Sequence, residues 1–330
     1  MSTQVDPEVQ IILDEIAVLA AKAPPLPEIP IDVQRAGDLH FAKLCRGERP
    51  AEIVSHTQDH SARGRNGIIP LRLYFPASGP AVGTLMFFHG GGFLRGDLDT
   101  HDDLCRALAN AAQAVVVGVN YRRAPEHKFP AAFHDCCDAT VWIAENTHAL
   151  GLPAGRLAVG GDSAGGNLAA TVAQWAYDSG KAALFFQLLI YPETSASLEW
   201  PSVKEFWEPG RMAAGKGMSW FRSQYFENAA QVLEAYAYPD NREDLAGLPP
   251  ALVISAEIDP MRDMAEAYAK RLEAAGVTTR LSRYDGVTHV FLSMFGRVSA
   301  ARRAIAEAGV ALHSAFQGTM PQPPASLQHD

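Results

Sequence analysis

Cysteine is scarce in this sequence. The 330 residues contain four, Cys45, Cys105, Cys136 and Cys137. Adjacent Cys136 and Cys137 cannot easily bridge each other, and no Cys-x-x-Cys spacing occurs, so a disulfide framework, a zinc site and a thioredoxin-like motif are all disfavoured. We therefore expect reduced, partly buried thiols, no bound metal, and a cytoplasmic protein.

Long hydrophobic runs and clusters of basic residues are also missing. No apolar run reaches about 18 residues, so no membrane span is predicted. The start, MSTQVDPEVQ, lacks the basic and apolar segments of a secretory signal. The net charge is −9 with no block of Lys or Arg, which disfavours nucleic acid as a partner. What is abundant is apolar: 48% of residues are hydrophobic and 20% charged, enough for a large folded core.

The central part of the chain alternates between apolar strands and helices. A hairpin-like pair of strands is predicted first, at 52–56 and 68–75. Buried strands follow at 85–88, 115–119, 157–159, 184–190, 251–255 and 280–284, and helices are predicted at 102–112, 167–177, 261–275 and 298–316. Continuous apolar strands separated by helices predict an α/β fold with a mostly parallel sheet covered on both faces.

Two stretches interrupt this alternation. An amphipathic helix is predicted near 6–22, followed by the Pro-rich stretch APPLPEIP, and an aromatic-rich stretch without a strand lies between two sheet strands. Both are expected to form a helical cap. The predicted organisation is a cap segment at 1–50, core at 51–193, a cap insertion at 194–238, core at 239–317 and a disordered tail at 318–330.

The pentapeptide Gly161-Asp162-Ser163-Ala164-Gly165 lies between a predicted strand and a predicted helix. A G-x-S-x-G sequence in this context is typical of a sharp turn that exposes a serine hydroxyl above a sheet. The alternative is a helix start with small residues for close packing. The position after an apolar strand favours the catalytic interpretation.

A second glycine-rich segment, His89-Gly90-Gly91-Gly92-Phe93, directly follows the strand LMFF. Glycines let backbone N–H groups approach a carbonyl oxygen that becomes negative during ester hydrolysis. A dinucleotide-binding loop would need glycine at position 95, where the chain has Arg95. No cofactor is therefore expected.

A serine nucleophile also needs a base and an orienting acid, and in this type of fold they follow the serine in the order acid, histidine. His289 comes in a loop directly after a strand, whereas His313 lies within a predicted helix and His329 in the tail. The position of His289 therefore makes it the candidate base.

Three carboxylates could be the acid, namely Glu257, Asp259 and Asp263 in the segment AEIDPMRD after the strand ALVIS. Their spacing alone does not choose among them. Pro260 restricts the residue before it to an extended conformation, which favours Asp259, and Asp263 is placed to stabilise the start of the next helix.

Taken together, six motifs in this order resemble the hormone-sensitive-lipase family of α/β-hydrolases, the bacterial family IV esterases. They are HGGGF, YRRAPE at 121–126, GDSAGGN, LPPA at 248–251, DPMRD at 259–263 and the loop that ends at His289. The resemblance implies a catalytic triad and an oxyanion hole, with these residues: Ser163 as nucleophile, Asp259 as acid, His289 as base, and the N–H groups of Gly91, Gly92 and Ala164 as oxyanion donors.

The resemblance implies a serine carboxylesterase that needs no cofactor and acts on small esters with short-to-medium acyl chains. An amidase or lactone hydrolase could use the same triad. A binding protein like the gibberellin receptor or a plant-type dehydratase could share the scaffold, but His289 and Ser163 favour an enzyme. A homodimer is a possible assembly. The family usually carries glycine after the base, so Val290 is expected to narrow the rim of the pocket.

Overall fold

The order of the strands explains why the middle of the sequence is so apolar. In the computed structural model, which describes residues 4–21, 23–206 and 215–319, eight strands form one sheet in the order β1-β2-β4-β3-β5-β6-β7-β8. Their bounds are β1 His56–Gly64, β2 Gly67–Phe75, β3 Thr84–Phe88, β4 Val115–Val119, β5 Leu157–Asp162, β6 Leu184–Ile190, β7 Ala251–Ile258 and β8 Thr279–Thr288.

Strands β1, β2 and β4 pair antiparallel, and β4, β3, β5, β6, β7 and β8 pair parallel in that spatial order. Every residue of β3, β4 and β5 is buried. Continuous burial is expected where helices cover both faces of a parallel sheet, so the predicted strand type is confirmed.

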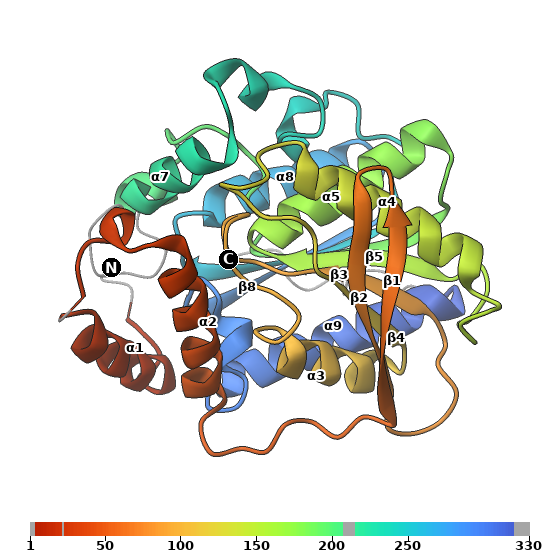
Figure 1. Ribbon diagram of the computed structural model, residues 1–330, viewed down its shortest axis with the longest axis horizontal. Helices are drawn as coiled ribbons and strands as arrows, with labels where there is room; N and C mark the ends of the chain where they lie inside the picture. Colours follow the sequence, from red (N-terminus) through yellow and green to blue (C-terminus); the bar gives the residue numbers. More distant parts are fainter. Residues whose placement is uncertain (1–3, 22, 207–214, 320–330) are drawn as a thin grey trace, which may run out of the picture.

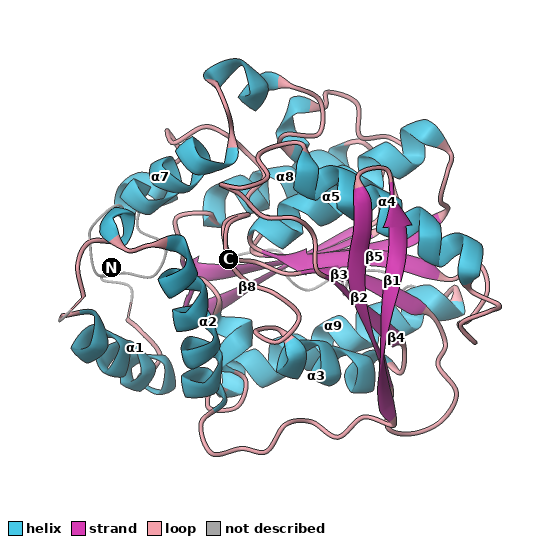
Figure 2. Ribbon diagram, viewed as in Figure 1, coloured by secondary structure: helices cyan, strands magenta, loops and turns pink. Residues whose placement is uncertain are grey.

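Helices cover the two faces of the sheet in separate layers (Figure 1). Side chains of α3 and α9 join one core cluster, and side chains of α4, α5 and α8 join the other. The bounds of these five helices are α3 Asp102–Ala112, α4 Ala131–Asn146, α5 Ala164–Ser179, α8 Arg262–Ala274 and α9 Ser299–Gln317. The sheet therefore lies between two helical layers, as Figure 2 shows.

The two predicted cap stretches contain most of the remaining helical elements, α1 Pro7–Ala20, η1 Leu26–Glu28, α2 Ile31–Arg46, α6 Pro201–Glu205, α7 Gly215–Tyr225 and η2 Ala229–Leu233. Two short elements lie outside them, η3 Pro239–Asn241 and, after the last strand, η4 Phe291–Met294. Residues 207–214 of the predicted insertion and 320–330 of the predicted tail lie outside the described residues. The domain boundaries given from the sequence stay a prediction.

Two elements differ from the sequence-based expectation. The first strand was expected at 52–56 but runs from His56 to Gly64, and Arg65 and Asn66 form the turn of its hairpin with β2. Its residues are mostly polar and exposed, because β1 is an edge strand, so the alternation that predicts a strand is missing. Helix α4 was not predicted, because polar residues such as Asp135 and Thr140 are buried among its apolar ones.

All four cysteines are free and buried. Burial raises the pKa of the Cys45 thiol to about 12, which keeps it in the unreactive thiol form at neutral pH. Among the described residues, no helix combines the length and apolarity needed to cross a membrane, and no cluster of three or more His, Cys, Asp or Glu side chains in this part could hold a metal ion.

Two glycine substitutions test the helical layers. A Cβ on Gly309 of α9 would lie 2.5 Å from backbone atoms of Ala111, at the crossing with α3, whereas a Cβ on Gly37 of α2 would meet nothing within 4 Å. We expect Gly309→Ala to lower the free energy of unfolding by about 1–3 kcal/mol through overpacking. Gly37→Ala should raise it by about 1 kcal/mol through helix propensity. Thermal and urea unfolding measure both changes. A Gly309→Ala protein at least as stable as the parent would contradict the close crossing.

Candidate active site

Ser163 stands at the turn between β5 and α5, with its backbone in an unusual conformation at φ 57° and ψ −120°. The two flanking glycines make this turn sterically accessible. A Cβ on Gly161 would lie 2.3 Å from the Gly165 carbonyl oxygen, and one on Gly165 would lie 1.9 Å from the Phe88 carbonyl oxygen. The pentapeptide therefore needs glycine at both positions, as the nucleophile turn of such folds does.

The structure brings Ser163, His289 and Asp259 into one hydrogen-bonded chain. His289 Nε2 lies 2.8 Å from Ser163 Oγ, and His289 Nδ1 lies 2.6 Å from Asp259 Oδ2. The ionised carboxylate can only accept, so Nδ1 carries the proton that it donates. Nε2 is then free to accept the proton of the serine hydroxyl. All three residues are buried.

Two opposing effects set the pKa of His289. Burial lowers it, because the imidazolium loses its hydration, while the negative charge of Asp259 and the hydrogen bond to it raise it. The net result is a pKa above the ordinary 6.5. The neighbouring carboxylate therefore makes the imidazole a stronger base than it would be in the same buried place alone.

The other two candidate carboxylates have different partners. Glu257 Oε2 accepts the backbone N–H of Gly286 at 2.7 Å, which ties the end of β7 to β8. Asp263 Oδ2 accepts the backbone N–H of Ser202 in α6 at 2.8 Å. Its Oδ1 pairs with Arg262 Nε at 2.8 Å. In the described structure Asp259 is the only carboxylate that accepts a hydrogen bond from the His289 ring.

The two remaining histidines that follow Ser163 in the chain are not part of this group. His313 on α9 contacts the carbonyl oxygen of Ala112 through Nδ1, at 3.3 Å. His329 lies outside the described residues.

The predicted oxyanion donors come from two segments: Gly91 and Gly92 follow β3, and Ala164 follows Ser163. Gly91 and Gly92 have φ values of 117° and 63°, and a Cβ on Gly91 would lie 2.4 Å from the Arg95 carbonyl oxygen. Among the described residues, no group accepts a hydrogen bond from the backbone N–H of Gly91 or Gly92. Ala164 is the first residue of α5, so its N–H has no partner within the helix. These three donors are therefore available to an external acceptor.

A buried carboxylate that sequence reasoning did not single out holds the glycine loop. Asp162 Oδ1 accepts the N–H of Gly90 at 2.9 Å and lies 3.2 Å from His101 Nε2. Burial raises the pKa of Asp162, but the charge of His101 and its hydrogen bonds lower it more, and the net shift is downward. On the other side of the loop, Tyr121 donates its hydroxyl to the carbonyl oxygen of His89 at 2.6 Å.

Helix α2 also forms hydrogen bonds to the segment after this loop. The sequence did not predict these contacts. Arg35 Nε donates to the carbonyl oxygen of Leu94 at 2.8 Å, and its Nη2 donates to that of Ala124 at 3.0 Å. The same guanidinium pairs with Glu126 at 2.8 Å. One turn further along α2, Asp38 accepts the N–H of Gly96 at 3.3 Å. Helix α2, from the N-terminal part of the chain, therefore holds the segment after the glycines.

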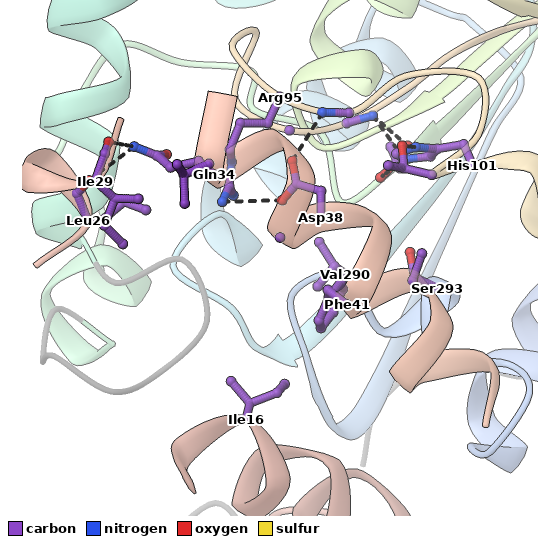
Figure 3. Close-up of a pocket in the computed structure, with 18 residues that line it drawn as sticks. Ile16, Leu26, Ile29, Gln34, Asp38, Phe41, Arg95, His101, Val290 and Ser293 are labelled. Atoms are coloured by element: carbon purple, nitrogen blue, oxygen red, sulfur yellow. Dashed lines mark hydrogen bonds and ion pairs between the residues drawn. The ribbon is translucent and has the colours of Figure 1, made fainter. Parts of the chain in front are cut away.

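A cavity of about 400 Å³ opens between α2, the glycine loop and the segment after His289 (Figure 3). Gly90 and Gly91 of the glycine loop line it, and α2 contributes the polar side chains of Gln34 and Asp38 as well as apolar ones. The apolar side chains that line it are Ile16, Leu26, Ile29, Val33, Phe41, Ala42 and Val290. An apolar arm of a small molecule bound at Ser163 could enter this space.

Comparison with known proteins identifies chains similar to this one. A family model described as alpha/beta hydrolase fold matches residues 85–293. Carboxylesterase NlhH of Mycobacterium tuberculosis is 37% identical over 322 residues, which cover 94% of this chain and 96% of that protein. Ethyl acetate hydrolase of Pseudomonas putida is 38% identical over 299 residues, covering 89% and 93%. A hyperthermophilic esterase from Pyrobaculum calidifontis superimposes with a TM-score of 0.87 at 38% identity, covering 94% and 98%.

The matched model, the relatives and the shared motifs show that this chain belongs to the α/β-hydrolase family, in its hormone-sensitive-lipase branch. The fold class and the family resemblance predicted from the sequence are thereby confirmed.

One substitution tests the link between the cap and the acid loop. The charges and hydrogen bonds around Asp263 lower its pKa more than burial raises it, so this carboxylate contributes stability above its unfolded pKa and loses it as pH falls. We expect Asp263→Asn to lower the free energy of unfolding at pH 7 by about 1–2 kcal/mol. The difference from the parent should shrink on acidification below pH 3.8, the ordinary value.

Thermal unfolding across pH measures this effect, and exposed Asp285 on β8 provides a matched control through Asp285→Asn. Equal losses in the two variants would show that Asp263 has no special role.

Proposed function

We propose that this chain is a serine carboxylesterase that hydrolyses small esters with acyl chains of about four to eight carbons. The observation that carries the proposal is the unbroken contact from Asp259 through His289 to Ser163, with distances of 2.6 and 2.8 Å. Relatives named carboxylesterase and ethyl acetate hydrolase support the same reaction class.

In the proposed mechanism, Ser163 Oγ attacks the ester carbonyl carbon while its proton moves to His289 Nε2. Asp259 keeps the imidazole in the productive tautomer and stabilises the imidazolium that forms. The N–H groups of Gly91, Gly92 and Ala164 donate to the oxygen that becomes negative. His289 then gives its proton to the leaving alcohol. Water repeats the sequence on the acyl-enzyme and releases the acid.

The alternatives are less well supported. An amidase or lactone hydrolase could use the same groups, but the names of the relatives, carboxylesterase and ethyl acetate hydrolase, describe ester hydrolysis. A binding protein on this scaffold would not need the 2.8 Å contact between His289 and Ser163, and a dehydratase would not need the serine. Four free, buried thiols support a cytoplasmic location. A homodimer is also proposed, and light scattering tests it.

A series of p-nitrophenyl esters from acetate to palmitate tests the function and the acyl preference together. We expect kcat/KM to be highest between butyrate and octanoate, because a cavity of about 400 Å³ limits the arm that can be buried. Ser163→Ala should fold and lose about three or more orders of magnitude in kcat. A maximum at palmitate with activation by emulsified lipid would refute the acyl preference. Near-parental turnover of Ser163→Ala would refute the nucleophile.

The acid is tested by its effect on the pH profile. The base must be neutral to act, and a His289 pKa above 6.5 places the acid limb of kcat/KM above that pH. We expect Asp259→Asn to lower kcat by about 10⁴-fold through loss of the imidazole tautomer. It should also move the acid limb to lower pH, because burial then acts on the imidazole without the raising charge.

Glu257→Gln is the matched control, since Glu257 lies two residues away and contacts Gly286 rather than the imidazole. It should lose less activity and keep the position of the limb. A larger loss in Glu257→Gln than in Asp259→Asn would show that the acid has been misassigned.

A further inference from the structure

Val290 has a backbone conformation that its side chain disfavours. Its φ is 60° and its ψ 18°, in the left-handed region. Of the non-glycine residues with positive φ in the described part of the chain, it is the only one with a β-branched side chain. Such residues are rare in this region, because the branched Cβ crowds the backbone. Because strained backbone conformations cluster at functional positions, this strain points to a functional role for the Val290 side chain.

The residues on either side explain why the backbone turns there. His289 directs its ring toward Ser163 and Asp259, while Phe291 is fully buried with its ring 5.9 Å from that of Tyr191. The Val290 carbonyl oxygen also accepts the N–H of Ser293 at 3.0 Å, which starts η4. The turn is thus fixed by its neighbours, and glycine would satisfy it without crowding.

The Val290 side chain lies on the wall of the 400 Å³ cavity. Phe41 of α2 and Ile16 of α1 line the same cavity (Figure 3). Gly91, a proposed oxyanion donor, lines the same cavity. An arm of an ester substrate that enters this cavity shares the space with the isopropyl group of Val290.

We propose that Val290 is a specificity-determining residue that limits the bulk of one arm of the ester, acyl or alcohol, in the cavity between α2 and the glycine loop. This proposal rests on the proposed esterase function. The three side-chain carbons of Val290, the residue after His289, limit the bulk of that arm. The strained left-handed backbone of Val290 is the energetic cost of placing them there.

Two substrate series and two substitutions test it. One series keeps an acetyl group and enlarges the alcohol from ethyl to cyclohexylmethyl; the other keeps ethanol and enlarges the acyl group from acetyl to cyclohexylacetyl. The quantity measured is the ratio of kcat/KM for the bulkiest ester to that for ethyl acetate. We expect Val290→Gly to raise this ratio about tenfold in one series only, because a few methyl-sized groups in an apolar pocket have effects of this size. Val290→Ala should give a smaller rise in the same series.

Thermal unfolding separates backbone strain from packing. Ala normally melts above Gly at the same position, because Gly gains more freedom in the unfolded chain. At a left-handed position the order reverses, so Val290→Gly should melt above Val290→Ala.

Gln113→Gly is the matched control for the ratio of kcat/KM values. Gln113 also has positive φ, at 50°, but it ends α3. This substitution should leave the ratio unchanged.

An unchanged ratio in both series, or equal rises in both, would overturn the proposal while leaving ester hydrolysis itself intact. A parent protein that hydrolyses no member of either series would overturn the proposed function and this inference with it.

Discussion

The geometry of the site depends on one steric constraint, the approach of α5 to the end of β3. The Phe88 carbonyl oxygen occupies the space that a side chain at residue 165 would need. Because β3 and β5 are parallel neighbours, this contact sets the serine turn directly against the glycine loop that leaves β3. The sheet itself therefore positions the proposed nucleophile and the proposed oxyanion donors, before any polar interaction is added.

Polar groups then fix the loops that the sheet leaves free. Asp162 lies between the serine turn and the glycine loop and binds the latter through the Gly90 N–H. Glu257 has a comparable role at the other end of the site, where it accepts the N–H of Gly286 in β8, the strand that precedes His289. Each proposed catalytic side chain thus comes from a strand end, and each strand end is tied to its neighbour by a carboxylate that takes no part in the proposed proton transfer.

The sequence predicted those parts of the structure that short segments determine. The strands β3 to β7 are largely apolar runs, and the glycine loop and the serine turn follow β3 and β5 directly. Strand β8 is more polar, and His289 follows it directly. Strand β1 could not be predicted in the same way, because an exposed edge strand has no apolar alternation. Pro260 and the family resemblance favoured Asp259 over Asp263, but the contact of Asp259 with His289 spans 30 residues and no local pattern predicts it. The roles of Arg35 and Asp38 depend on how α2 packs, which no local pattern encodes.

The contacts of α2 bear on how members of this family could exchange parts. Arg35 spans the loop after the glycines and the segment at Ala124 and Glu126 with a single guanidinium. A chimera that received its first 50 residues from a relative would inherit that relative's helix and lose these partners unless the residue at position 35 were matched. The N-terminal segment thus supports the loop next to the proposed site. Recombination across its boundary is expected to succeed only when α2 and the loop after the glycines are transferred together.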